Sequence, residues 1–209
     1  MKKELLKVMK KEVYGKKYFE SINYVNYLDR KNKYIKHAED IKQLLESVSL
    51  LNPNSKILDY GCAVGFLLEG FKKQGYNNIH GFDISEWALE QCKNKNLNVL
   101  ENFQHESFDL ITALDVFEHM TDKEIKSALN YFNTNTLLVR IPCSVDGEDY
   151  HLDISKLDPT HCNCKTKNGW KKLFKSLGYD LFLNINISTI YDTPGVLCWL
   201  CIKTPIENE

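Results

Sequence analysis

The chain has 209 residues, of which 43% are hydrophobic and 26% are charged. These values are ordinary for a globular protein and fit one α/β domain with one core. The formal net charge is -1, whereas proteins that hold nucleic acid through its phosphates carry a basic surplus. Nucleic acid is therefore not an expected partner.

The sequence also argues against membranes, disulfides and metal. No apolar run approaches the roughly 20 residues that span a bilayer, and the charged start lacks a secretory-signal pattern. The seven cysteines are irregularly spaced, so we expect reduced thiols in a cytoplasmic protein. Cys198 and Cys201 lie three apart on an expected strand and would face opposite sides. Zinc held by His161, Cys162 and Cys164 together with Cys198 and Cys201 is therefore not expected, and no metal site is predicted for the chain.

The predicted elements alternate between strands and helices. Residues 1–33 show weak helical periodicity, whereas 34–51 carry the apolar stripe of a helix. Strands are then expected at 56–60, 79–82, 97–100, 108–114, 136–141, 179–187 and 195–203, and helices at 66–73, 86–93, 122–132 and 167–177. This order predicts an α/β fold: a mostly parallel, seven-stranded sheet with helices on both faces and a C-terminal antiparallel pair. We expect a single domain, 1–209.

Several helices carry start and stop signals. Ser85 and Thr166 precede helical patterns and are N-cap candidates. Thr121 and Glu124 have the spacing of a capping box. Gly178 is an expected helix stop.

An acidic, glycine-rich turn follows the first expected strand, with the pattern Asp59-x-Gly61-x-Ala63-x-Gly65. Glycines let the backbone approach a ligand closely, and the next helix begins with unpaired N–H groups. A dinucleotide fingerprint, G-x-G-x-x-G, fails because Phe66 stands at its last glycine position. An ordinary strand-to-helix turn is the alternative for this motif alone.

A second acid, Asp83, ends the next expected strand. In nucleoside-binding α/β folds an acid at this place accepts hydrogen bonds from ribose hydroxyls. An aspartate at a strand end is by itself more often a turn or cap residue. Two acids at corresponding strand ends favour a nucleoside site.

These motifs resemble those of class I S-adenosylmethionine-dependent methyltransferases. Residues 59–65 resemble motif I, with Ala63 replacing the middle glycine, and 81–85 resemble motif II. Residues 107–111 and 115–119 resemble the family's fourth strand and the acidic-x-x-Glu-His segment after it. The likeness is good over about residues 34–141 and loose elsewhere. It is nearest to the small-molecule branch, with the ubiquinone-pathway and sugar methyltransferases.

The resemblance implies a Rossmann-like fold, S-adenosylmethionine as cofactor and S-adenosylhomocysteine as product. It also implies that 1–33 folds over the site as a lid, with core packing of its aromatic residues as the alternative. Glu101 or Asn102 would lie near the adenine. The implied cofactor-binding residues are Tyr14, Tyr18, Asp59, Gly61, Cys62, Ala63, Gly65, Asp83, Ile84, Asn102 and Asp115.

The acceptor is expected at the loop 142–165, because loops of this length are usually functional or disordered. Residues 158–161 resemble an Asp-x-x-His element in relatives that modify sugars and surface glycans. His161 is the first candidate base, because imidazole titrates near neutral pH, and His119 is the second. Capping or pinning of the loop is the alternative for His161, and for His119 the alternative is that Glu118-His119 ties the strand end to its helix. Catalysis by proximity alone would leave both histidines without the role of base.

Arg140 lies near the end of an expected buried strand, where apolar residues are usual. Its guanidinium would either grip an anionic acceptor bidentately or pair structurally with a carboxylate of the chain. Together with Tyr150 and His151 it is a candidate acceptor-binding residue.

The sequence therefore predicts a cytoplasmic enzyme, monomeric or homodimeric, that methylates an oxygen or nitrogen of a small metabolite. An anionic sugar or surface-glycan precursor is the expected kind of acceptor. Two alternatives remain open: an S-adenosylmethionine-binding protein without turnover of its own, and a methyltransferase acting on protein or RNA.

Overall fold

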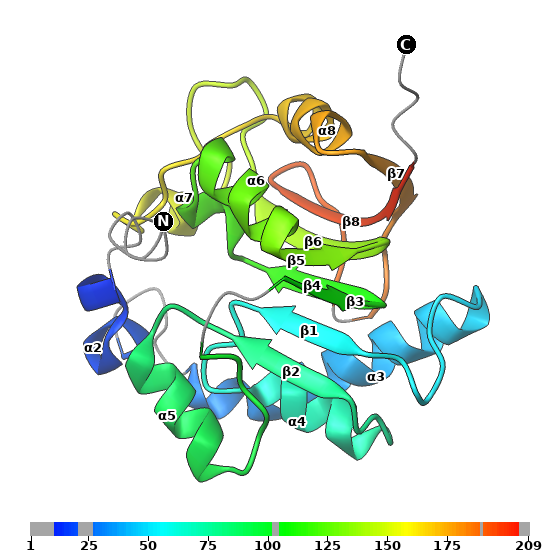
Figure 1. The fold of residues 1–209 in the computed structure, drawn as a ribbon. Coiled ribbons are helices and arrows are strands. Elements are labelled where there is room, and N and C mark those ends of the chain that lie inside the picture. Colours follow the sequence, from blue (N-terminus) through cyan, green and yellow to red (C-terminus); the bar gives the residue numbers. More distant parts are fainter. Residues whose placement is uncertain (1–10, 21–26, 102–104, 189, 205–209) are drawn as a thin grey trace. The chain divides into compact units, whose positions relative to one another are not determined.

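The computed structural model describes residues 11–20, 27–101, 105–188 and 190–204. The chain divides into two compact units, 1–104 and 105–209, which are taken in turn below (Figure 1). Among the described residues, no helix is both long enough and apolar enough to cross a membrane.

The first unit contains a parallel strand pair. β1 (Ile57–Tyr60) lies beside β2 (Ile79–Phe82), with Ile57 opposite Ile79. Its helices are η1 (Lys11–Tyr14), α2 (Lys16–Phe19), η3 (Leu28–Arg30), α3 (Lys31–Ser47), α4 (Phe66–Lys73) and α5 (Glu86–Asn94). α3 and α4 pack against each other.

Local signals account for most of these boundaries. The stripe expected at 34–51 buries Ala38, Ile41 and Leu45 on α3, because residues three and four apart share a helix face. α3 ends at Ser47, earlier than expected, and Ser49 follows with a left-handed φ of 59°. The predicted N-cap of α5 is confirmed, because Ser85 Oγ accepts a hydrogen bond from Ala88 N at 3.1 Å.

The strand expected at 97–100 is not formed. Val99 makes only an isolated bridge to Gly81. Gly81 N donates to Asn98 O at 2.9 Å, and Leu100 N donates to Gly81 O at 2.8 Å. The apolar run thus lies beside β2 but is too short there to make a ladder of its own.

The second unit holds six strands and four helical segments among its described residues. The strands are β3 (Glu106–Phe108), β4 (Leu110–Leu114), β5 (Phe132–Thr134), β6 (Thr136–Pro142), β7 (Tyr179–Asn184) and β8 (Val196–Lys203). The helical segments are η4 (Phe117–His119), α6 (Asp122–Tyr131), α7 (Asp153–Lys156) and α8 (Lys167–Ser176).

The sheet of the second unit has the order β4-β6-β8-β7. β4 and β6 are parallel, whereas β8 runs antiparallel to both β6 and β7. β3 and β5 form a separate parallel pair. The α/β fold, with mostly parallel strands and antiparallel C-terminal strands, is confirmed. The capping box of Thr121 and Glu124 and the N-cap at Thr166 are confirmed as well.

The number of strands was wrong, since the described residues form eight rather than seven. The strand expected at 108–114 is broken at the exposed Asp109, so that β3 pairs with β5 while β4 joins the larger sheet. β5 has no periodic signal of its own and was not predicted. The loop expected at 142–165 contains the short helix α7.

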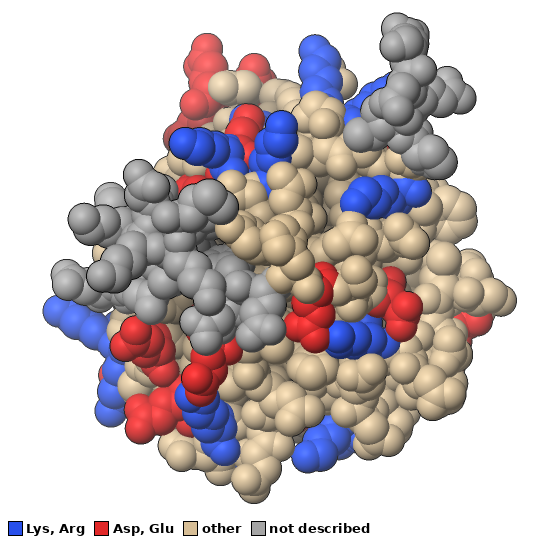
Figure 2. Space-filling view, viewed as in Figure 1, with Lys and Arg blue, Asp and Glu red and all other residues tan. Residues whose placement is uncertain are grey.

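The surface charge matches the composition. On the face drawn in Figure 2, acidic and basic side chains of the described residues lie beside one another in several places. This mixture agrees with the net charge of -1.

Candidate active site

The motif loop of the first unit joins the end of β1 to the start of α4. Gly61, Ala63 and Gly65 all have left-handed backbone, with φ of 82°, 47° and 82°, which explains the need for small residues there. The amide groups of Gly61 and Cys62 both donate to Phe82 O, at 2.7 and 3.0 Å. The end of β2 therefore holds the loop in place.

Asp83 ties this loop to the start of α5. Its Oδ2 accepts from Ala63 N and its Oδ1 accepts from Ser85 N, both at 2.8 Å. Burial raises the pKa of Asp83, while hydrogen bonds from the backbone of Ser85, Ala63 and Ile84 act in the opposite direction. Each carboxylate oxygen keeps a lone pair beyond its backbone partner. Asp83 thus both organises the loop and can still accept a hydrogen bond from a ligand.

The other strand-end acid of the first unit is Asp59, which lies on β1 and is 5% exposed. Asn102, the residue expected near the adenine, lies outside the described residues. Its neighbour Glu101 is exposed and pairs with Lys93 at 2.5 Å.

Aromatic residues from the N-terminal segment pack against the motif loop. Phe19 and Tyr27 are buried in a cluster with Val64, Phe66 and Ala88. The rings of Tyr14 and Tyr18, both predicted cofactor contacts, lie 4.7 Å apart, and Tyr18 packs against the same cluster. For Phe19 and Tyr27 the structure therefore shows core packing, which was the alternative to a lid over the site.

Tyr27 is one of the aromatic residues of 1–33, and no separate role was predicted for it. Burial raises its pKa, and the charges of Tyr34, Asp59 and Asp83 add to this effect. Its hydroxyl group is thus electrostatically coupled to both strand-end acids. Its place among several tyrosines was the only sequence signal.

In the second unit, Asp115 and Arg140 form an ion pair through Asp115 Oδ2. Asp115 follows β4 with a left-handed φ of 57°, and its amide donates to Arg140 O at 2.7 Å. The two side chains are 32% and 34% exposed. Of the two interpretations of Arg140, the structure shows pairing with a carboxylate of the chain. The predicted cofactor contact Asp115 has this arginine as a partner.

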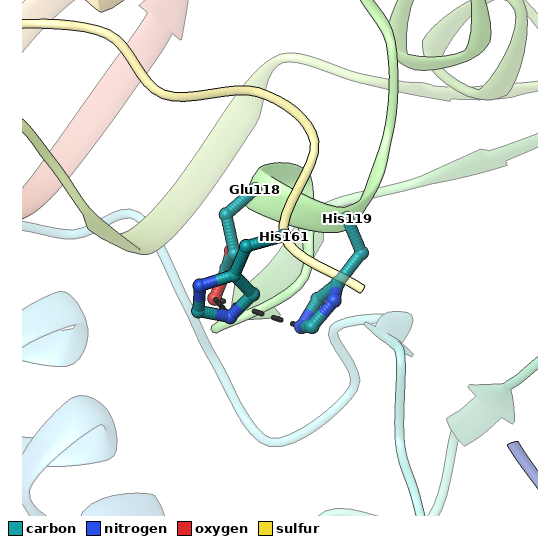
Figure 3. Close-up of side chains that lie close together, drawn as sticks. All are labelled: Glu118, His119 and His161. Atoms are coloured by element: carbon teal, nitrogen blue, oxygen red, sulfur yellow. Dashed lines mark ion pairs between the residues drawn. The ribbon is translucent and has the colours of Figure 1, made fainter. Parts of the chain in front are cut away.

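Glu118, His119 and His161 lie together beyond the carboxyl end of β4 (Figure 3). Glu118 and His119 belong to η4, and His161 comes from the long loop after β6. The two imidazole rings are 4.6 Å apart between centroids and inclined by 69°. Nε2 of His119 is 3.9 Å, and Nε2 of His161 is 4.0 Å, from Glu118 Oε1. The structure therefore brings both predicted base candidates together around one carboxyl group.

Hydrogen bonds fix the tautomer of His119. Thr160 Oγ1 donates to Asp158 Oδ1 at 2.5 Å and lies 2.8 Å from His119 Nδ1. Since the hydroxyl proton is used on Asp158, the imidazole must donate from Nδ1. The lone pair of His119 is then on Nε2, the atom that faces Glu118.

Both imidazoles are uncharged at neutral pH. Burial, together with His161, lowers the pKa of His119 to about 4, against the opposing charge of Asp158. Burial also lowers the pKa of His161, with Asp158 and the backbone of Ser155 acting in the opposite direction. Each ring can therefore accept a proton or bind an electron-poor group.

Glu118 matched the acidic-x-x-Glu-His segment in the sequence, but no acid, base or ligand role was predicted for its side chain. Its side chain is 1% exposed, and neither carboxylate oxygen has a hydrogen-bond partner among the described residues. Burial raises its pKa well above the usual range; the charge of Asp115 adds to this, and Arg140 opposes it. A buried polar group without a partner calls for an explanation.

The long loop is fastened to η4 by its backbone. The amides of Cys162 and Asn163 donate to Glu118 O at 2.9 and 3.0 Å. Asn163 Nδ2 donates to Met120 O at 2.7 Å. These bonds hold His161 beside His119, so the pinning role proposed as an alternative for this loop is fulfilled by its backbone.

The two remaining acceptor candidates differ in position. Tyr150 is buried, and its ring lies 5.0 Å from that of His161; burial raises the pKa of its hydroxyl group. His151 is exposed, and its ring lies beside Gly195. The structure therefore adds Tyr150 to the cluster and leaves His151 at the surface.

Solved structures with the same fold are methyltransferases. Magnesium protoporphyrin IX methyltransferase from Synechocystis, with bound S-adenosylhomocysteine, has a TM-score of 0.65 and 15% identity, over 95% of this chain and 100% of that chain. A putative methyltransferase of Haloferax volcanii, in complex with an activator, has a TM-score of 0.66 and 12% identity, over 91% and 98%. A Clostridium acetobutylicum S-adenosylmethionine-dependent methyltransferase has a TM-score of 0.61 and 15% identity, over 81% and 92%. The chain therefore has the Rossmann-like fold of class I methyltransferases.

The family follows from the sequence match. The model of a methyltransferase-domain family matches residues 29–183, which is most of the chain. The chain belongs to this family and is an S-adenosylmethionine-dependent methyltransferase. No protein of curated function matches its sequence.

The first unit fits this cofactor. Asp83 keeps lone pairs that suit ribose hydroxyls, and the left-handed backbone at Gly61 and Ala63 lets a ligand approach the start of α4. Bound there, S-adenosylmethionine supplies a methyl group on a sulfonium centre.

Proposed function

We propose that this enzyme methylates an oxygen or nitrogen of a small metabolite, of the sugar or surface-glycan-precursor class, and that Glu118, His119 and His161 contact the acceptor. The observation that carries the proposal is the pair of uncharged, largely buried imidazoles beyond the carboxyl end of β4. Ligands of open α/β sheets bind outside the carboxyl ends of the strands. We further propose a cytoplasmic monomer or homodimer.

The reaction needs little from the protein besides alignment and a route for one proton. A lone pair of the acceptor attacks the methyl carbon, the carbon–sulfur bond breaks, and S-adenosylhomocysteine leaves with the electron pair. The acceptor loses its proton, which needs a group within hydrogen-bond reach. His119 Nε2 and His161 Nε2 supply lone pairs in the cluster, whereas Glu118 supplies a carboxyl group.

The small-molecule part of the proposal is supported by charge and by the loop. The net charge of -1 gives no general attraction for nucleic acid. Residues 158–161 resemble the element of sugar-modifying relatives, and within this element Thr160 Oγ1 lies 2.8 Å from His119 Nδ1. Cys162 and Asn163, which follow the element, bond to Glu118 O of η4. Pairing of Arg140 with Asp115 favours a structural role for the guanidinium, so we do not extend the proposal to an anionic acceptor.

The test uses S-adenosylmethionine labelled in its methyl group and three acceptor pools: small metabolites, RNA and protein. We expect label in the small-metabolite pool, with Asp83→Asn reducing the rate about tenfold or more, since a hydrogen bond to a charged group contributes roughly 1.5–3 kcal/mol. Asp109→Asn, at an exposed position, is the matched control. Label found only in the RNA pool or only in the protein pool would show that the acceptor is a macromolecule and not a small metabolite. Binding of S-adenosylhomocysteine without label in any pool would favour a protein without its own turnover.

A further inference from the structure

We propose that Glu118, His119 and His161 bind one divalent transition-metal ion, through Glu118 Oε1 and the Nε2 atom of each histidine. In Figure 3 the carboxylate and both rings point toward one another. One ligand atom from each residue lies within 4.8 Å of the other two. The inference rests on the proposed function and deepens it, because the ion would take the Nε2 lone pairs of the same two histidines and the acceptor would bind at the ion's open position.

The distances are close to those of a coordination shell. Glu118 Oε1 lies 3.9 Å from His119 Nε2 and 4.0 Å from His161 Nε2. Around Zn²⁺, with ligands at about 2.0–2.2 Å, neighbouring ligand atoms of a tetrahedron are roughly 3.4 Å apart. Each histidine must therefore approach Glu118 Oε1 by roughly half an ångström, and the ligand atoms of the two histidines lie within 4.8 Å of each other.

The burial of Glu118 supplies an independent argument. Both of its carboxylate oxygens are inaccessible and without a hydrogen-bond partner among the described residues. A buried carboxyl group in this state is costly, whereas buried carboxylates that coordinate a metal are compensated. A cation between the three side chains provides the partner that no described residue provides.

The surroundings of His119 are those of a metal ligand, whereas Nδ1 of His161 is buried without a hydrogen-bond partner among the described residues. His119 donates through Nδ1 to Thr160, which donates in turn to Asp158. Such an outer hydrogen bond fixes the tautomer and aims the other ring nitrogen at the ion. On the far side, the backbone bonds from Cys162 and Asn163 to Glu118 O hold the two ligand segments together.

The ligand types select the class of ion. Two imidazoles and one carboxylate suit Zn²⁺, Co²⁺, Mn²⁺ or Fe²⁺, whereas Mg²⁺ and Ca²⁺ prefer oxygen ligands. Three protein ligands leave at least one position open, as in catalytic rather than structural zinc sites. An oxygen-containing group can occupy that position.

Titration of the metal-depleted, full-length chain with Co²⁺ tests the proposal without any methyl acceptor. We expect one Co²⁺ per chain with micromolar or tighter affinity, visible absorption bands of low-coordinate Co²⁺, displacement by Zn²⁺, and no competition from Mg²⁺ at equal concentration. His161→Asn and His119→Asn should each weaken binding about 100-fold or more, because losing even an outer-shell partner costs roughly 10–100-fold. His105→Asn should bind as the wild type, because His105 is exposed and stacks on Tyr131.

A second readout covers the case of poorly folded histidine variants. Glu118→Gln keeps the size of the side chain and removes the anionic ligand. Co²⁺ should raise the Tm of the wild type and of His105→Asn but not that of Glu118→Gln. Three results would overturn the proposal: no Co²⁺ binding by the wild type below about millimolar concentration, unchanged affinity in Glu118→Gln and the folded histidine variants, or equally tight binding of Mg²⁺.

Discussion

At the scale of single residues, alanine substitutions at two glycines with left-handed backbone distinguish the cost of backbone strain from the cost of overpacking. A Cβ on Gly65 (φ +82°) would lie 2.5 Å from Leu97 Cδ1 and 2.9 Å from Cys92 Sγ, whereas one on Gly75 (φ +93°) meets no described atom within 4 Å. We expect Gly75→Ala to lower the free energy of unfolding by about 1–2 kcal/mol, the left-handed penalty. Gly65→Ala should cost about 2–5 kcal/mol, because overpacking adds roughly 1–3 kcal/mol to the left-handed penalty. Urea denaturation measures both, and equal losses would show that the motif loop relaxes around the added methyl group.

The cysteines differ in the protonation that burial imposes. Burial raises the pKa of Cys198 and Cys201 to about 12 and that of Cys143 to about 11, so all three remain thiols at pH 8. Because the thiolate is the nucleophile, we expect an alkylating reagent to modify the exposed Cys162 first and the partly exposed Cys164 later. Cys143, Cys198 and Cys201, whose thiol pKa values are raised, should react only after unfolding. Peptide mass spectrometry identifies the sites, and rapid modification of Cys143 in the folded chain would contradict this order.

The residues that the sequence could predict are those whose roles are local. Asp59 and Asp83 stand at strand ends whose positions follow from short apolar runs, so their place at the edge of the fold was foreseeable. The burial of Glu118 was not foreseeable, because Cys162 and Asn163, which donate to its backbone carbonyl, lie about forty positions further along the chain. No local pattern reports a contact at that separation.

At the scale of elements, the capping box of α6 makes a measurable contribution. Thr121 Oγ1 accepts from Glu124 N at 3.4 Å, and Glu124 Oε2 accepts from Thr121 N at 2.7 Å. We expect Thr121→Ala to lower the free energy of unfolding by about 1 kcal/mol, the usual cost of losing an N-cap. Ser127→Ala, inside the same helix, should have little effect or stabilise slightly, since alanine has the higher helix propensity. An unchanged free energy of unfolding in Thr121→Ala would mean that packing alone sets the start of α6.

Helix starts depend on residues that are close in the sequence, whereas strands depend on partners elsewhere in the chain. The caps at Ser85, Thr121 and Thr166 were predictable because each depends on a few neighbouring residues. The strand expected at 97–100 failed, and β5 was missed, because a strand exists only where a partner continues alongside it. Val99 finds one bridge beside Gly81, whereas Phe132–Thr134 finds a three-residue partner in β3.

At the scale of the whole molecule, the two proposed ligands should protect different stretches of backbone. S-Adenosylhomocysteine should slow amide hydrogen exchange within 61–65 and 83–88 of the first unit, and Co²⁺ within 117–120 and 158–163 of the second. The reason is that each ligand stabilises the segments that hold it, by about 2.7 kcal/mol at one hundred times its dissociation constant. Mass spectrometry of peptides measures the exchange. Protection by Co²⁺ centred on the motif loop would place the ion elsewhere.

The fold class was predictable because it depends on the alternation of apolar runs, a property of the entire sequence. The division into units 1–104 and 105–209 was not, because it reflects the distribution of contacts and no composition change marks residue 104.

The double attachment of the long loop bears on how such an enzyme can change. Ser144 N donates to Lys165 O at 2.9 Å, and Ser144 also bridges to Tyr150, while Cys162 and Asn163 are bonded to η4. Between these anchors the loop exposes Val145, Ile154 and Leu157. Substitutions, insertions and grafts at these positions leave the anchors, and with them the histidine cluster, intact. Variation at these exposed positions can therefore change the surface of the loop while the proposed acceptor site keeps its histidines in place.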